Sequence, residues 1–147
     1  MSIAADVRAQ MEVIERGAVE IFPRTEMEAK LARSIQTGKP LRVKFGMDPT
    51  APDIHLGHTV PLRKLRQFQD LGHQAVLVVG NFTALVGDPS GRSKTRPELG
   101  LDEIEANAAT YLDQAGMVLD AERLEVVHNG DWFSKMSFQD VLRLAGK

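Results

Sequence analysis

Residues 75–79 form an uninterrupted apolar run, Ala-Val-Leu-Val-Val, and this run restricts the possible folds more than any other segment. A strand-length run without alternating polar residues is typical of a parallel sheet covered on both faces. Two other segments have strand character. Residues 41–45 alternate between apolar and polar side chains, and residues 124–128 read Leu-Glu-Val-Val-His. We therefore expect three parallel strands.

Helical patterns separate these strands. Residues 57–71 predict a helix between the first two, with Pro61 tolerated in its first turn and Gly72 as its C-terminal cap. Residues 101–116 predict the next helix, and residues 138–144 begin another after the third strand. Strictly alternating strands and helices favour right-handed crossovers. The fold class expected is α/β, a parallel sheet with flanking helices.

Two helices are expected before the sheet. Apolar residues from Val7 to Ile21 recur at steps of three and four, which predicts a helix that Pro23 ends. Thr-Glu-Met-Glu at residues 25–28 fits a capping box and predicts a second helix that runs towards Gly38.

The 147 residues correspond to one domain in size, which we divide into an N-terminal helical segment, 1–39, and an α/β part, 40–147. The net charge of −2 offers no argument for nucleic-acid binding. The absence of cysteine excludes disulfides and thiolate metal sites. No apolar stretch is long enough to span a membrane, and no secretory signal is visible, so we expect a cytoplasmic protein without a membrane partner.

Two loops that follow predicted strands contain most of the chemically informative residues. They are residues 46–58 and 80–96. Ligands of open parallel sheets bind outside the carboxyl ends of the strands. We therefore expect both loops to contribute to one site.

The first loop ends in His-Leu-Gly-His. His55 and His58 flank the expected helix start, where unpaired N–H groups and the helix dipole favour anions, and Gly57 lets a ligand approach the backbone. This pattern suggests a phosphate site, although two surface histidines at a helix start would give the same spacing. A zinc site would need a third ligand that the spacing does not supply. The candidates are Asp48, Asp53, His73 and His128.

The second loop, residues 87–96, reads Gly-Asp-Pro-Ser-Gly-Arg-Ser-Lys-Thr-Arg. It is not a Walker A loop, because its glycines are too close together and arginine follows the second one. Two interpretations remain open: a solvated basic loop, or a polar pocket that uses a lone carboxylate and several cations to bind ammonium and phosphate groups.

Together, residues 46–58 and 87–92 resemble the bacterial type of tyrosyl-tRNA synthetase. His-Leu-Gly-His is similar to the His-Ile-Gly-His signature of class I aminoacyl-tRNA synthetases. The earlier Asp-Pro-Thr and the later Gly-Asp-Pro-Ser-Gly narrow the resemblance to the tyrosyl enzyme. It covers most of the chain. It implies a Rossmann-like catalytic domain that condenses tyrosine with ATP, accompanied by Mg²⁺, to tyrosyl-adenylate. The domain then transfers tyrosine to tRNA(Tyr), in a full-length homodimer.

The resemblance also implies catalytic residues. His55 and His58 would contact the phosphates of ATP, and Thr50 would reach the same region. Arg92 and Arg96 would stabilise the departing pyrophosphate, although many family members have lysine at the place of Arg92.

Four more residues would bind substrate by the same resemblance. Gly46 and Asp48 would line the place where tyrosine meets ATP, and Gly57 would lie under the nucleotide. Asp88 would hold the substrate ammonium. Lys44 departs from the family, because many members have a tyrosine there that contacts the substrate phenol.

The family's second signature, Lys-Met-Ser-Lys-Ser, does not occur in the 147 residues. Ser-Lys-Met-Ser at residues 134–137 comes too early in the fold to replace it. We therefore expect an incomplete catalytic domain, without the anticodon-binding region. The alternative for this chain taken alone is a non-catalytic fragment that binds ATP or another anion.

Overall fold

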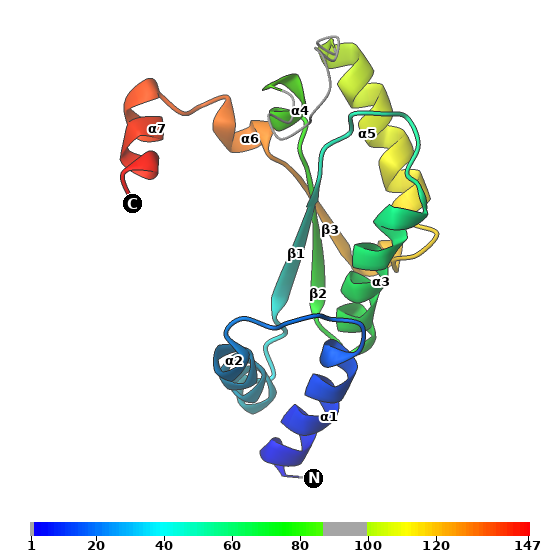
Figure 1. Cartoon of the computed structure of the whole chain (residues 1–147), viewed down its shortest axis with the longest axis vertical. Helices are drawn as coiled ribbons and strands as arrows, with labels where there is room; N and C mark the ends of the chain where they lie inside the picture. Colours follow the sequence, from blue (N-terminus) through cyan, green and yellow to red (C-terminus); the bar gives the residue numbers. More distant parts are fainter. Residues whose placement is uncertain (1, 87–99) are drawn as a thin grey trace.

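A three-stranded parallel sheet forms the centre of the protein in the computed structural model, which describes residues 2–86 and 100–147 (Figure 1). The strands are β1 (Arg42–Met47), β2 (Gln74–Val79) and β3 (Leu124–His128), arranged in chain order. All three predicted strands are confirmed. Met47 pairs with Val79, and Val79 pairs with His128, so the carboxyl ends of the strands lie in one row.

Helices α3 (Leu56–Asp70) and α5 (Leu101–Ala115) connect the strands and pack on the same side of the sheet (Figure 1). The strands follow one another in a single direction across the sheet, so two crossovers of the same hand place both helices on the same side. The opposite side of β1 presents Arg42, Lys44 and Gly46, which are exposed. The α/β class and the parallel sheet are therefore confirmed.

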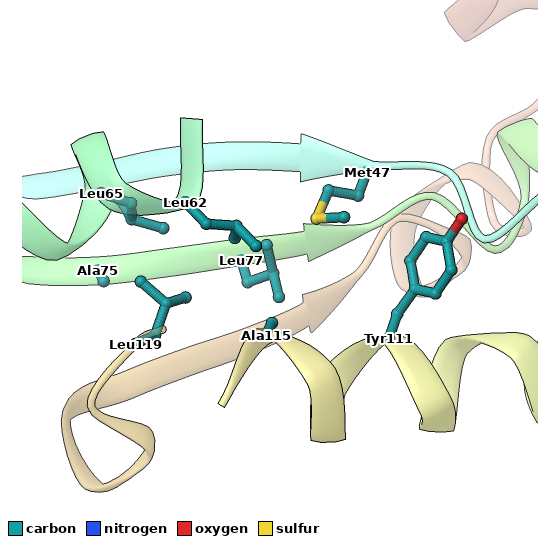
Figure 2. Close-up of a cluster of buried hydrophobic side chains, with 8 residues drawn as sticks. All are labelled: Met47, Leu62, Leu65, Ala75, Leu77, Tyr111, Ala115 and Leu119. Carbon is teal, nitrogen blue, oxygen red and sulfur yellow. The ribbon is translucent and has the colours of Figure 1, made fainter. Parts of the chain in front are cut away.

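The main core lies between the sheet and these two helices. Figure 2 shows side chains from β1, β2, α3 and α5 that converge on one cluster. Leu62 of α3 and Leu77 of β2 are at most 1% exposed, which places them at its centre. The buried members are Met47, Leu62, Leu65, Ala75, Leu77, Tyr111, Ala115 and Leu119.

The two N-terminal helices, α1 (Ile3–Glu15) and α2 (Arg24–Thr37), lie at the amino ends of the strands (Figure 1). A second cluster, made of Met11, Ile14, Leu31 and Phe68, joins them to α3. Lys64 of α3 donates to the carbonyl oxygens of Ile14 and Arg16 at 2.8 and 2.7 Å, and so binds the C-terminal end of α1.

His73, just before β2, forms hydrogen bonds through both ring nitrogens. Its Nδ1 accepts from the backbone N–H of Leu41 at 3.3 Å, and its Nε2 lies 3.0 Å from Oε1 of Gln10. The side chain is 5% exposed, and burial lowers its pKa. A neutral imidazole therefore links α1 to the segments before β1 and β2.

Three local predictions were wrong. The first helix ends at Glu15 rather than at Pro23, because Gly17 has φ +78° and turns the chain. The second helix begins at Arg24 with Pro23 as its N-cap, so residues 25–28 lie inside the helix and form no capping box. Because α3 begins at Leu56, Pro61 lies beyond its first turn.

Short helices account for the remaining differences. The expected long loop after β2 begins with α4 (Thr83–Val86). A 3₁₀ turn (Ala121–Arg123) precedes β3, and α6 (Gly130–Phe133) follows it. The last expected helix is confirmed as α7 (Phe138–Ala145). Between them, the helices in the described parts of the chain include none long and apolar enough to cross a membrane.

Candidate active site

The segments that follow the three strands meet at one edge of the sheet. The backbone N–H of Gly80 donates to Met47, and that of Asn129 donates to Val79, at 2.8 and 3.0 Å. These bonds extend the ladder past the last strand residues. The loop after β1 therefore lies beside the first residues after β2 and β3, as predicted for one common site.

The imidazoles of His55 and His58 cap the N-terminus of α3. His55 is the N-cap residue, and its Nδ1 accepts from the backbone N–H of Gly57 at 3.1 Å. The Nδ1 of His58 accepts from the backbone N–H of His55, also at 3.1 Å. The two ring centroids are 4.1 Å apart. One of the predicted unpaired N–H groups of the helix start, that of Gly57, is thus bonded to a histidine of the chain itself.

These bonds decide which ring nitrogens can act as donors. A neutral imidazole that accepts at Nδ1 has its proton on Nε2. Partial burial and the neighbouring His55 lower the pKa of His58, which favours its neutral form. Each histidine therefore presents an Nε2–H donor in place of a backbone N–H.

Gly57 fits closely against the side chain of His55. A Cβ atom at this position would lie 2.8 Å from Cε1 and 2.9 Å from Nδ1 of His55. The sequence interpretation explained this glycine by the approach of a ligand. In the structure, the imidazole ring of His55 already occupies the space beside it.

Gly46 differs from Gly57, because a methyl group there would meet only ordinary contacts, the nearest at 3.9 Å from Nζ of Lys44 and from the carbonyl oxygen of Val78. Internal packing therefore does not demand a glycine at this exposed position. Lys44, the departure from the family pattern, lies beside it on the same face of β1.

Side chains of helix α5 form hydrogen bonds with the loop between β1 and α3. The Nδ2 of Asn107 donates to the carbonyl oxygen of Pro49 at 3.2 Å, and the Nε2 of Gln114 donates to that of Pro52 at 3.1 Å. The backbone N–H of Ile54 donates to Oε1 of Gln114 at 3.0 Å. Thr50, half-buried on this loop, is thus held near Asp48, whose carbonyl accepts its N–H at 2.8 Å.

Asp48 contacts residues that the sequence analysis did not identify. Its Oδ1 accepts from the hydroxyl of Thr83 at 2.8 Å, and Oγ1 of Thr83 lies 2.9 Å from Nδ2 of Asn129. A Cβ atom at Gly80 would lie 1.7 Å from Oδ1 of Asp48. The positions of Gly80 and Asn129, directly after predicted strands, were the signal that could have indicated them.

The structure brings six of the predicted site residues to this edge. They are Gly46, Asp48, Thr50, His55, Gly57 and His58. Asp88, Arg92 and Arg96 lie outside the described residues. His73 lies before β2, at the opposite end of α3 from His55, so it is not a third ligand for a zinc ion. Within residues 2–86 and 100–147, no three His, Asp or Glu side chains are grouped to hold a metal ion.

Comparison with protein families identifies the family of this chain. The family model of the class I tRNA synthetases for tryptophan and tyrosine matches residues 36–147. The chain belongs to this family. The resemblance of the chain to tyrosyl-tRNA synthetases is thereby confirmed.

Curated relatives of this class I synthetase chain are tyrosine–tRNA ligases. The protein of Symbiobacterium thermophilum is 54% identical over 141 residues, which cover 96% of this chain and 35% of the relative. That of Chlorobaculum tepidum is 50% identical over 143 residues, covering 97% and 35%. The chain thus spans about a third of the length of these relatives.

Solved structures support the same synthetase fold. The tyrosyl-tRNA synthetase of Aeropyrum pernix superposes with a TM-score of 0.69 at 24% identity, over 96% of this chain and 40% of that one. A truncated mitochondrial tyrosyl-tRNA synthetase of Coccidioides posadasii gives a TM-score of 0.62 at 25% identity, over 97% and 45%.

Proposed function

We propose that this chain is the N-terminal part of the catalytic domain of a tyrosine–tRNA ligase. The whole enzyme would activate tyrosine with ATP to tyrosyl-adenylate and pyrophosphate, and then transfer tyrosine to the 3′ end of tRNA(Tyr). The observation that carries this proposal is the pair of imidazoles at the start of α3, both bonded through Nδ1 to the helix backbone. This pair supplies two adjacent Nε2–H donors at the carboxyl edge of the sheet.

The activation step needs no dedicated base. A substrate α-carboxylate, with a pKa near 3.5, is already ionised at neutral pH. One of its oxygens attacks the α-phosphorus of ATP, and the bond to the bridging oxygen breaks, so that pyrophosphate leaves with the electron pair. Catalysis then depends on donors and cations placed where negative charge develops.

His55 and His58 are suited to stabilise this charge. Their donors are oriented by the helix start before any ligand binds, so little reorganisation is needed in the transition state. We assign Thr50 to the same phosphate region, and Arg92 and Arg96 to the pyrophosphate. Mg²⁺ would accompany ATP as a complex with its phosphates, as is usual for this ion.

The substrate residues follow the same proposal. Gly46 and Asp48 would border the place where tyrosine meets ATP, and exposed Gly46 leaves room that internal packing does not fill. Gly57 would lie under the nucleotide with His55 folded over it. Asp88 would bind the substrate ammonium.

We retain the division into a helical segment, residues 1–39, and the first part of the catalytic domain, residues 40–147, as a proposal. We also propose that the full-length enzyme is a cytoplasmic homodimer. For residues 1–147 alone, we propose binding of ATP or another anion without catalysis, since the chain matches only 34–35% of the length of its curated relatives.

The test compares the 147-residue chain with a full-length ligase that carries it. We expect tyrosine-dependent exchange of pyrophosphate into ATP in the full-length protein alone. No exchange there, with tyrosine and ATP both present, would contradict the proposed activity. Exchange by the 147-residue chain at the full-length rate would contradict the proposal that the remainder is required.

A further inference from the structure

A chain of hydrogen bonds crosses the carboxyl ends of all three strands and ends on Asp48. Asn129 follows β3, Thr83 begins α4 after β2, and Asp48 follows β1. The Nδ2 of Asn129 lies 2.9 Å from Oγ1 of Thr83, which in turn lies 2.8 Å from Oδ1 of Asp48. Three elements far apart in sequence therefore meet in one line of polar contacts.

The direction of these bonds is determined at the Asn129 end. The backbone N–H of Phe82 donates to Oδ1 of Asn129 at 2.8 Å, which fixes the orientation of the amide. Asn129 is 6% exposed and must then offer Nδ2, which only donates, to Thr83. The hydroxyl of Thr83 accepts this bond and keeps its own proton for another acceptor.

Two acceptors are within reach of that proton. They are Oδ1 of Asp48 at 2.8 Å and the carbonyl oxygen of Gly80 at 3.2 Å. The carboxylate is nearer, and hydrogen bonds to charged groups are stronger than those between neutral groups. The proton of Thr83 is therefore directed to Asp48.

Gly80 bounds the same carboxylate on its other side. A Cβ atom there would overlap Oδ1 of Asp48 at 1.7 Å and approach Oγ1 of Thr83 to 2.6 Å. The carboxylate thus rests on a bare Cα atom while Thr83 holds one of its oxygens. Within the described residues, the other oxygen, Oδ2, has no hydrogen-bond partner, and Asp48 is exposed.

We propose that Thr83 and Asn129 are positioning residues that hold Asp48 so that Oδ2 accepts a hydrogen bond from a substrate hydroxyl or ammonium group. This inference rests on the proposed function, because it assigns Asp48 to the place where tyrosine and ATP meet. Thr83 and Asn129 act through Asp48 and need not touch either substrate.

The first experiment removes the hydroxyl of Thr83 in the full-length ligase. Thr83→Val keeps the shape of the side chain but loses the bond, and we expect kcat/KM for pyrophosphate exchange to fall by about 10- to 100-fold. Thr83→Ser keeps the hydroxyl and should restore most of the rate. Thr37→Val serves as the matched control, because the hydroxyl of Thr37 bonds within α2, far from this edge.

The second experiment asks whether the effect passes through Asp48. In an Asp48→Asn background, Thr83→Val should cause little further loss, because residues that act as one unit are not additive. Gly80→Ala displaces the carboxylate without removing a hydroxyl, and its loss should also disappear in that background. The tyrosine dissociation constant is measured for the same single and double variants, because it remains measurable where pyrophosphate exchange is too slow.

Four outcomes would overturn the inference: full activity of Thr83→Val, full activity of Asp48→Asn, equal losses for Thr83→Ser and Thr83→Val, or an undiminished effect of Thr83→Val in the Asp48→Asn background. A fall in melting temperature far beyond that of Thr37→Val would also overturn it in favour of a purely structural role. A wild-type ligase without exchange would instead contradict the proposed function.

Discussion

His55 has two functions in the structure, and two substitutions separate them. Its Nδ1 caps α3 by accepting the backbone N–H of Gly57, while its Nε2 is proposed as a phosphate donor. His55→Ala removes both groups. His55→Asn keeps an N-cap acceptor, since asparagine is among the best N-cap residues, but removes the more distant imidazole donor.

The expected magnitudes differ for the two functions. Loss of an N-cap costs about 1 kcal/mol, which lowers the melting temperature of a domain of this size by about 3 °C. His55→Ala should show this loss in the 147-residue chain, and His55→Asn should show little of it. Loss of a donor to developing negative charge slows a reaction by about 100- to 1000-fold. Both variants should therefore form adenylate slowly in the full-length ligase.

The assays are thermal unfolding of the 147-residue chain and pre-steady-state adenylate formation by the full-length ligase, with tyrosine affinity as a control. Near-normal adenylate formation by His55→Asn would show that the histidine only caps the helix, and would refute the donor role. Metal that copurifies with the wild type, together with activity lost to a chelator despite added Mg²⁺, would support a zinc site instead.

Two other predictions concern stability. Burial lowers the pKa of His73, and partial burial with His55 lowers that of His58, so the unfolded chain binds more protons than the folded one below about pH 6.5. The free energy of unfolding should be highest above this pH and decrease as the pH falls through it. In urea titrations, His73→Gln should show a weaker decrease than the wild type. An unchanged pH dependence in this variant would contradict the assignment. Leu62→Ala should cost about 2–5 kcal/mol, because Leu62 is 0% exposed, whereas Leu56→Ala, at 84% exposed, should cost less than about 0.5 kcal/mol; similar urea midpoints for both variants would contradict the core assignment.

Local sequence patterns were sufficient for the strands and for most helices. The apolar run at residues 75–79 became β2, the central strand of the sheet, where four of its five residues are buried. Patterns failed where a competing local signal was stronger. Thr-Glu-Met-Glu at residues 25–28 fits a capping box, yet Pro23 already occupies the N-cap position and the helix begins before Thr25.

The sequence by itself placed the histidines and the loop after β1 at the edge of a parallel sheet, because the positions of strands and helix starts follow from local sequence patterns. Only the tertiary structure decided how the histidines are used. Their Nδ1 atoms bond to the helix start, which is a matter of side-chain rotation. Only the structure joined Asp48 to Thr83, 35 residues further along the chain, and Thr83 to Asn129, another 46 residues further. Such contacts depend on the register of three strands, and no local pattern contains that register.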